Sequence, residues 1–265
     1  MKFDFFHASN MRFSSQFNED RTGQNRILER SVARLIYDQG LYSGALGDLK
    51  HAIRCYVRIT ERSDVDSALR TTALRAQAYS LRLLGQTDEA LHVVDEALAS
   101  AQTGGERAHE GHAHALRGAI LGDVCEYKEA RAAFARSEEL SGPMGARRAL
   151  WRAEFELQTG QTSAARERSL ANLKICEELG WPGHVAHCEA VLGFAALADG
   201  KGDAGAHLRN LRTWTQQTLE AELVARADAL AHRLDVSSGA LTELQSRPST
   251  REFQGLMRWF SAPAE

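Results

Sequence analysis

The sequence predicts an all-α protein in which antiparallel helix hairpins are stacked one after another along the chain. Two observations support this prediction. The composition favours helices, since the 265 residues include many alanines, leucines and arginines but only four prolines. A pattern of small and large apolar residues around a glycine also recurs along the chain, which is typical of helical repeats.

The bulk composition is that of a folded, water-soluble protein and excludes several classes. The net charge is -3, from 35 acidic and 32 basic residues, so the whole chain gives no electrostatic reason to bind nucleic acid. No apolar run approaches the roughly 20 residues needed to cross a membrane. The first residues, MKFDFFHASNMRF, do not form a secretory signal. The scattered cysteines favour reduced thiols, and we expect a cytoplasmic protein.

The clearest copy of the repeated pattern surrounds Gly85 in the stretch LLGQTDEALHVVDEALA. Ala78 lies in a helix that Gly85 is expected to end, because glycine readily adopts the left-handed conformation found at helix ends. Thr87 can then cap a second helix, in which Ala90 and Ala97 are small. Antiparallel helices approach to about 8 Å only where the crossing side chains are small, so these alanines predict the crossing points of a hairpin.

Four further stretches repeat this layout, and their turns are spaced by roughly 35 to 45 residues, the range of helical-hairpin repeats. The first copy is expected to turn at Gly40, and the third turns after Gly118 and Leu121. The fourth and fifth copies are centred on Gly160 and Gly200. Because a single hairpin cannot bury its apolar face, the hairpins are expected to stack on each other.

These residues resemble the tetratricopeptide repeat (TPR), whose pattern has a small residue late in the first helix, then an aromatic residue and two small residues in the second. The matching residues are Ala33, Tyr42, Ala45 and Ala52 in the first copy, Ala78, Ala90 and Ala97 in the second, and Gly118, Tyr127 and Ala130 in the third. The fourth and fifth copies depart from it, since Glu156 and Arg209 fall where aromatic residues are expected. The resemblance implies a right-handed superhelical solenoid of about five to six hairpins, with TPR-like repeats over residues 26–218.

The longer helices of the C-terminal half, with NLKICEELGW leading into HVAHCEAVLGFAALADG, are similar to the repeat regions of bacterial STAND-type signalling ATPases and related regulators. Such proteins usually carry an ATPase or a helix-turn-helix in the same chain. The phosphate-binding pattern G-x-x-x-x-G-K-[ST] does not occur in this sequence, so an ATPase is not expected here.

The two ends of the chain differ from the repeats. Residues 1–25 hold five of the ten phenylalanines, too many for a disordered tail. We expect this segment to pack on the first hairpin, or else to insert into a groove or a partner. Residues 219–265 are expected to form C-terminal capping helices, the last with an apolar stripe of Phe253, Leu256, Met257 and Phe260. That last helix either caps the array or binds a partner.

No enzyme motif is recognisable, so neither a catalytic residue nor a cofactor is predicted. The most suggestive groups are two clusters: His109, His112 and His114, and then His184, His187 and Cys188. On a helix His112 and His114 would diverge, and a solvated helix start is the simpler interpretation. His184 and Cys188 share a helix face, but two residues make a weak metal site. No bound metal is therefore predicted.

The TPR resemblance implies that the first helix of each hairpin lines a concave groove. The family's groove positions fall on Arg30, Arg34 and Tyr37 in the first copy, Arg75, Tyr79 and Arg82 in the second, His112 in the third and Arg147 in the fourth. The N-terminal half of this groove is expected to be basic and aromatic. Arginine binds carboxylates or phosphates through two parallel hydrogen bonds, which favours an acidic ligand. Alternatively, these arginines pair with acids on neighbouring helices.

The resulting expectation is a non-enzymatic scaffold or sensor module that binds a protein or peptide segment in its groove, with neither nucleic acid nor a membrane as partner. The alternative is a regulator that responds to a peptide or small ligand and acts through a separate effector, such as a STAND ATPase or a transcription factor. A hydrolase or metalloenzyme that uses the histidines is the third interpretation.

Overall fold

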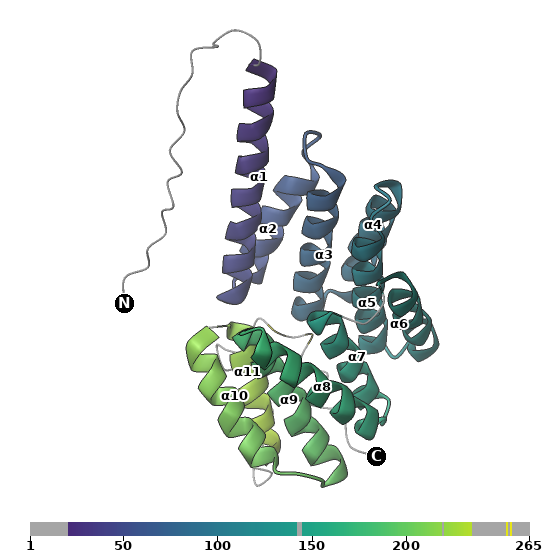
Figure 1. Cartoon of the computed structure of the whole chain (residues 1–265), viewed down its shortest axis with the longest axis vertical. Coiled ribbons are helices and arrows are strands. Elements are labelled where there is room, and N and C mark those ends of the chain that lie inside the picture. The colour runs from purple at the N-terminus through teal and green to yellow at the C-terminus, as the bar shows by residue number, and fades with distance from the viewer. Residues whose placement is uncertain (1–20, 142–144, 219, 235–252, 254, 256–265) are drawn as a thin grey trace.

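The computed structural model describes residues 21–141, 145–218, 220–234, 253 and 255, except for the side chains of residues 21–30, 141 and 146. Within these ranges the chain forms eleven α-helices and no strand, which confirms the predicted all-α class. Consecutive helices pack as hairpins, and the odd-numbered helices also contact each other along the array (Figure 1). None of these helices is both long and apolar enough to cross a membrane.

Helix α1 is the longest described helix, with 25 residues, and α2 is the shortest, with 12. In the N-terminal half they are α1 (Arg21–Ala45), α2 (Leu49–Thr60), α3 (Ser67–Leu84), α4 (Thr87–Thr103), α5 (Arg107–Asp123) and α6 (Tyr127–Ser141). In the C-terminal half they are α7 (Ala146–Gln158), α8 (Thr162–Glu178), α9 (Pro182–Asp199), α10 (Ala204–Thr218) and α11 (Ala221–Leu234). The Phe-rich residues 1–20 lie outside the described residues.

Most of the predicted turns are confirmed by backbone conformation. Gly85, Gly160 and Gly200 follow the ends of α3, α7 and α9 and have left-handed φ angles of 79°, 72° and 66°. In the turn after α5 the same conformation is adopted by Cys125, with φ of 64°. A left-handed residue satisfies the last carbonyl groups of a helix while reversing the chain, which is why these positions recur.

The predicted first turn at Gly40 is wrong. Helix α1 continues to Ala45, and the chain turns instead at Gly47, with φ of 89°. Gly40 lies at the crossing of α1 and α2, where an added Cβ would be 2.6 Å from a ring carbon of Tyr56. Tyr42 therefore belongs to α1 rather than α2, and its side chain is exposed. Residues 40 and 47 are seven positions apart, which is nearly two helical turns. The spacing of the apolar residues therefore fits a turn at either glycine.

Small residues lie where the helices cross, as the repeat pattern predicts. Ala78, Ala90 and Ala97 are completely buried in the core between α3 and α4. Gly118 of α5 lies directly against the ring of Phe134 of α6, and a Cβ there would be 2.9 Å from the ring. These contacts bring the backbones of each hairpin close together and leave the larger side chains to fill the space between hairpins.

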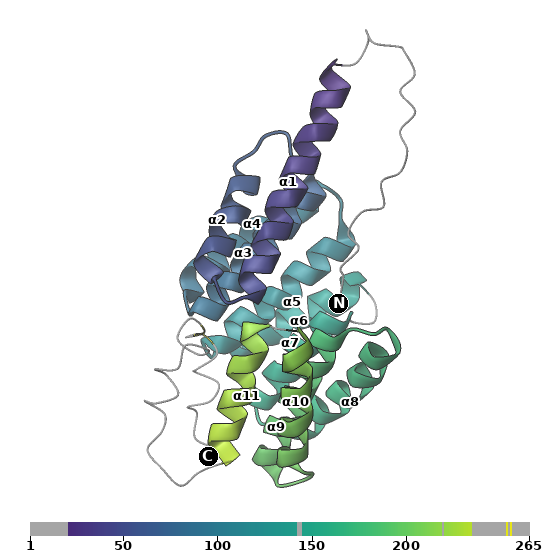
Figure 2. The same ribbon diagram turned by 90° about the vertical axis from the view of Figure 1, so that its left-hand side faces the viewer.

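The C-terminal helix closes the array. Figure 2 shows α11 beside α9 and α10 in the C-terminal half, below the N-terminal hairpins. One hydrophobic core joins Leu49 of α2 and Leu83 of α3 to Ala225 and Ala229 of α11. Phe253, the first residue of the predicted C-terminal stripe, is buried in the same core, whereas Leu256, Met257 and Phe260 lie outside the described residues.

Replacement of Gly118 by alanine is expected to lower the free energy of unfolding by about 1–3 kcal/mol, because the new methyl group meets a buried aromatic ring. Gly44→Ala is the matched control on α1, since its Cβ would meet only the methyl group of Ala52 at 3.7 Å. We expect this control to be neutral or to stabilise by up to about 1 kcal/mol through helix propensity. Urea denaturation measures both, and equal stabilities would contradict the tight α5–α6 crossing.

Candidate functional site

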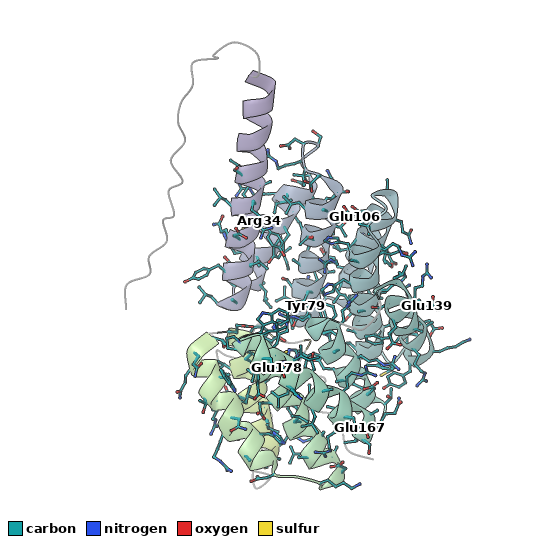
Figure 3. The ribbon with its side chains drawn as sticks, in the orientation of Figure 1. Arg34, Tyr79, Glu106, Glu139, Glu167 and Glu178 are labelled. Atoms are coloured by element: carbon teal, nitrogen blue, oxygen red, sulfur yellow. The ribbon has the colours of Figure 1, made fainter. Side chains whose placement is uncertain are left out.

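Two groups of charged side chains lie between the odd-numbered helices. The first, which we call the ion network, joins α3, α5, α7, α9 and α11 through Tyr79, Arg82, Asp123, Glu154, His187, Glu222 and Arg226. The second, the cation cluster, comes from α3, α5 and α7 and consists of Arg75, His109, His112, Arg147 and Arg148. Arg147 touches both groups. In Figure 3 Tyr79 lies near the centre of the array, between the N-terminal hairpins and the C-terminal helices.

The carboxylate of Glu154 is the centre of the ion network. Its Oε1 accepts a hydrogen bond from Nη2 of Arg226 at 2.7 Å and lies 2.6 Å from Nε2 of His187. Its Oε2 accepts from Nη2 of Arg82 at 3.2 Å. Arg82 also donates two bonds to Asp123, at 2.6 and 3.2 Å. The side chain of Glu154 is only 1% exposed, so these bonds replace all of its hydration.

The environment keeps Glu154 ionised. Burial alone would raise the pKa of Glu154, but Arg226, His187 and Arg82 outweigh burial and hold this pKa well below its ordinary value. Burial and the neighbouring Arg226 lower the pKa of His187, so its imidazole is neutral near pH 7. A neutral imidazole with its proton on Nε2 donates that proton to Glu154, which fits the short contact.

Glu222 of α11 ties the network to the middle of α3. The hydroxyl of Tyr79 donates to the Glu222 carboxylate at 2.7 Å, and Arg226 donates to the same carboxylate at 2.9 Å. The guanidinium of Arg147 donates to the Tyr79 hydroxyl at 3.3 Å and stacks over its ring at 5.4 Å. Burial, followed by the charge of Glu222, raises the pKa of Tyr79, so the phenol keeps its proton and remains a donor.

The cation cluster differs from the ion network because two of its arginines lack a carboxylate partner. Neither Arg75 nor Arg148 forms an ion pair with any acid among the described residues, although Arg148 is only 9% exposed. Burial lowers the pKa of both guanidinium groups, but free arginine is so basic that both stay charged. The Nε of Arg75 is buried and has no hydrogen-bond acceptor in the described part of the chain.

His112 and Trp151 lie within this cluster. Their rings are 5.5 Å apart and meet edge to face. Burial, followed by the charges of Arg75, Arg148 and Arg147, lowers the pKa of His112 to about 2. The indole N–H of Trp151 is buried without an acceptor among the described residues. The cluster therefore combines two buried N–H groups that lack acceptors with an excess of positive charge, since Glu106 is the acid that acts on Arg75 and His109.

An open depression of about 400 Å³ adjoins the cation cluster between α1, α3 and α5. Its lining residues are Ala33, Arg34, Val65, Asp66, Ala68, Leu69, Thr72 and His109. His109 links the depression to the cluster, because its Nδ1 lies 3.5 Å from Nη2 of Arg75 and from the hydroxyl of Thr72. The lining is mainly apolar, and its ionisable side chains are those of Arg34, Asp66 and His109.

The structure separates the sequence-predicted groove residues into two sets and leaves one undescribed. Arg34, Tyr37, Arg75, His112 and Arg147 lie around the cation cluster and the depression. Tyr79 and Arg82 lie in the ion network, where Arg82 is paired with acids on α5 and α7. Arg82 therefore fits the alternative interpretation, in which groove arginines pair with acids on neighbouring helices. The side chain of Arg30 lies outside the described residues.

Sequence reasoning missed Arg148 and Trp151 in the cation cluster, and Asp123, Glu222 and Arg226 in the ion network. The Arg147–Arg148 pair at the start of α7 was a usable signal, since consecutive arginines point to two adjoining surfaces of a helix. The ion network gave no local signal. Arg82 and its partner Glu154 are 72 residues apart, and Tyr79 and Glu222 are 143 apart.

The two candidate metal clusters are engaged in other contacts. Within the described ranges no group of three or more His, Cys, Asp or Glu side chains could hold a metal ion. His114 points away from His112 and lies 3.8 Å from Glu110. In the second cluster His187 contacts Glu154, and the ring of His184 lies 5.5 Å from that of Trp181.

Comparison with known proteins gives no relative. No model of a protein family matches the chain, and no curated protein is significantly similar to it in sequence. Inference about function therefore rests on the geometry of the ion network, the cation cluster and the depression.

The substitution Glu154→Gln is expected to lower the free energy of unfolding by about 3–5 kcal/mol, because it leaves the buried charges of Arg226 and Arg82 without their shared carboxylate. Asp38→Asn is the control. It breaks the Arg34–Asp38 pair, whose side chains are both more than half exposed, and is expected to cost less than about 1 kcal/mol. Chemical denaturation followed by circular dichroism measures both, and similar small losses would contradict a stabilising network.

Acid is expected to destabilise the fold through its buried neutral histidines. The folded-state pKa values of His112 and His184 are lowered to about 2 and about 4, and both groups titrate near 6.5 in the unfolded chain. Below about pH 6.5 the unfolded state therefore binds protons that the folded state does not. Stability is fully present above this pH and falls by about 1.4 kcal/mol per pH unit for each such histidine.

His112→Gln removes one histidine that binds a proton in the unfolded state but not in the folded state. The melting temperature of this variant should therefore fall less steeply between about pH 7 and 5 than that of the wild type. His92→Gln, at an exposed position on α4, serves as the control and should leave the slope unchanged. Calorimetry across this range checks the prediction. Parallel curves for wild type and His112→Gln would contradict it.

Proposed function

We propose that this chain is a non-enzymatic, TPR-like binding module of the cytoplasm, whose inner surface holds an acidic segment of a partner protein or peptide. One observation carries the proposal: Arg148 is buried and Arg75 is half-buried, and neither forms an ion pair with a described carboxylate. The right-handed superhelix and the TPR relationship belong to this proposal. Contacts among the odd-numbered helices, which line the inner surface in such arrays, support it.

An unneutralised cluster of arginines favours an anionic ligand on energetic grounds. Removing a guanidinium from water costs several kcal/mol, and this cost is offset only when an anion supplies hydrogen bonds and charge. Arg82 receives both from Asp123 and Glu154 within the chain. Arg75 interacts with the charge of Glu106 and lies 3.5 Å from Nδ1 of His109, but its Nε has no described acceptor, and neither Arg75 nor Arg148 is ion-paired with a described acid. A bound carboxylate would satisfy the Nε of Arg75 in the two-bond geometry that arginine prefers.

The surroundings of the cluster favour an acidic segment with apolar side chains over a simple inorganic anion. The depression beside His109 is largely apolar, with Ala33, Leu69 and Val65 in its lining. The buried rings of Trp151 and Tyr37 lie beneath the arginines and support them from the core. Mixed surfaces of this kind, aromatic and rich in arginine, are typical of the central residues of protein interfaces.

A second candidate function, the ligand-responsive regulator with a separate STAND ATPase or transcription factor as effector, is favoured by the position of Arg147. This side chain lies among the cations around His112 and also contacts Tyr79, which holds Glu222 of α11. A ligand that draws Arg147 away would weaken the contact between α3 and α11. Ligand-dependent change in the α3–α11 separation, measured by spin labels, distinguishes this regulator from a passive scaffold.

Removal of both uncompensated charges tests the binding proposal. The variant Arg75→Gln, Arg148→Gln is expected to bind acidic peptides that contain Phe or Leu at least about ten-fold more weakly than the wild type, since each charged hydrogen bond contributes about 1.5–3 kcal/mol. Fluorescence anisotropy with labelled peptides of matched length and varied charge measures the affinity.

The control for this experiment is Arg136→Gln, which removes an exposed arginine from α6 and should leave the affinity unchanged. Wild-type affinity should also fall with added salt and be lost for peptides in which the acids are replaced by amides. If the double variant binds as tightly as wild type, or if neutral peptides bind equally well, the cation cluster is not the binding site.

A further inference from the structure

One side of helix α1 is apolar and exposed to solvent. Val32 and Leu46 are 46% and 54% exposed, and Leu35 and Tyr42 are 67% and 69% exposed. Their spacings of three, seven and four positions place all four on one side of the helix, which we call the outer face. The opposite side of α1 is buried against α2 and α3. Helix α1 therefore has a second contact surface that its own hairpin does not use.

No described helix lies over the outer face. Figure 2 views the molecule from the left-hand side of Figure 1, and α1 lies there in front of the N-terminal hairpins with no labelled helix across it. Helix α1 also has 25 residues, whereas α2 has 12, so α1 extends past the hairpin to which it belongs. A partner can therefore reach this face without displacing a described element.

The charge pattern of the outer face favours a second copy of the same chain. Between residues 31 and 47 the only charged side chains are Arg34 and Asp38, and they pair with each other at 3.3 Å. Two copies that present this face to each other therefore bring no excess of like charge together, which would oppose association. The balanced charge also gives no attraction for a strongly acidic or basic partner.

The residues at the edges of the outer face are small. Ser31 and Ala45 lie along one edge, and Ser43 lies along the other. Two helices approach each other closely where the side chains at their contact are small. These edges therefore allow a second helix to pack against Leu35 and Tyr42.

The size of the outer face also agrees with a dimer. Each of its four large side chains exposes on the order of 100 Å². Two copies that bury this face remove on the order of 800 Å² from water, and the residues at the edges raise the total past the roughly 1,000 Å² expected of a biological interface.

We propose that the outer face of α1 is a homodimer interface, in which two copies of the chain pack α1 on α1 about a two-fold axis. Such a contact uses the same surface on both copies, so it closes after two chains and does not grow into a filament. It involves no residue of the ion network or the cation cluster, and it is therefore independent of the proposed binding function.

Measurement of molar mass tests this interface. Sedimentation velocity of the full-length chain should show a mass that rises with concentration toward twice the 29.2 kDa of one copy. The variant Leu35→Glu places a carboxylate in the interface of both copies, so its dimer dissociation constant should be at least about ten-fold higher. Leu170→Glu on α8 is the matched control, since Leu170 is 50% exposed and lies outside the outer face. This control should dimerise like wild type.

Three outcomes of this experiment would overturn the proposal. Wild-type protein that stays at the mass of one copy up to about 100 μM would exclude a dimer with micromolar affinity. A Leu35→Glu variant that dimerises as tightly as wild type would mean that another surface joins the two copies. Equal weakening by Leu35→Glu and Leu170→Glu would mean that added charge, and not the outer face, opposes association.

Oxidative footprinting separates a second copy from another part of the same chain. Leu35 and Tyr42 should be oxidised by hydroxyl radicals at least about three-fold more slowly at concentrations above the dimer dissociation constant than well below it, because the interface excludes solvent. Trp181, which is 44% exposed beside α9, is the control and should react equally at both concentrations. Protection of Leu35 and Tyr42 that is the same at every concentration would mean that the same chain covers the face, and it would exclude the dimer.

Discussion

The carboxylate of Glu154 is the interaction on which the arrangement of this protein depends. It is buried, and it accepts hydrogen bonds from α3, α9 and α11 at once, through Arg82, His187 and Arg226. A buried charge is tolerated only if its partners are held at hydrogen-bonding distance, so the positions of these helices are fixed relative to α7. Hydrophobic contacts determine that the hairpins stack. The Glu154 network adds contacts between helices that are distant in sequence, because it joins α3, α7, α9 and α11.

The charged residues between the odd-numbered helices form two groups with different roles. Around Glu154 two arginines face three carboxylates, and these arginines serve the fold. Around His112 the positive groups exceed the negative ones, and Arg75 and Arg148 have no described acid to bind. Arg147 connects the two parts through the Tyr79 hydroxyl. The charge that the fold leaves without an ion-pair partner therefore lies beside the depression at His109.

Local features of this structure were predictable from sequence, and non-local ones were not. The helical class, the turns at Gly85, Gly160 and Gly200, and the tight crossing at Gly118 follow from residue types within one hairpin. The prediction of a turn at Gly40 fails because sequence alone does not distinguish a glycine at a helix crossing from a glycine that ends a helix. An arginine on an inner helix face can be ion-paired, like Arg82, or without an ion pair, like Arg75. The difference depends on acids from helices that are distant in sequence, so no local sequence pattern predicts it.

The contact between Tyr79 and Glu222 joins residues 143 positions apart. An open repeat array has only contacts between neighbouring hairpins, so its ends fray independently and it can fold from any point. Here the last helix shares a hydrophobic core with α2 and α3, and it cannot leave without exposing Leu49 and Leu83. The chain must close a very long loop before the network forms, which makes folding slower than the abundance of short-range helical contacts would suggest. We therefore expect this helical array to fold and unfold cooperatively, as a globular domain does.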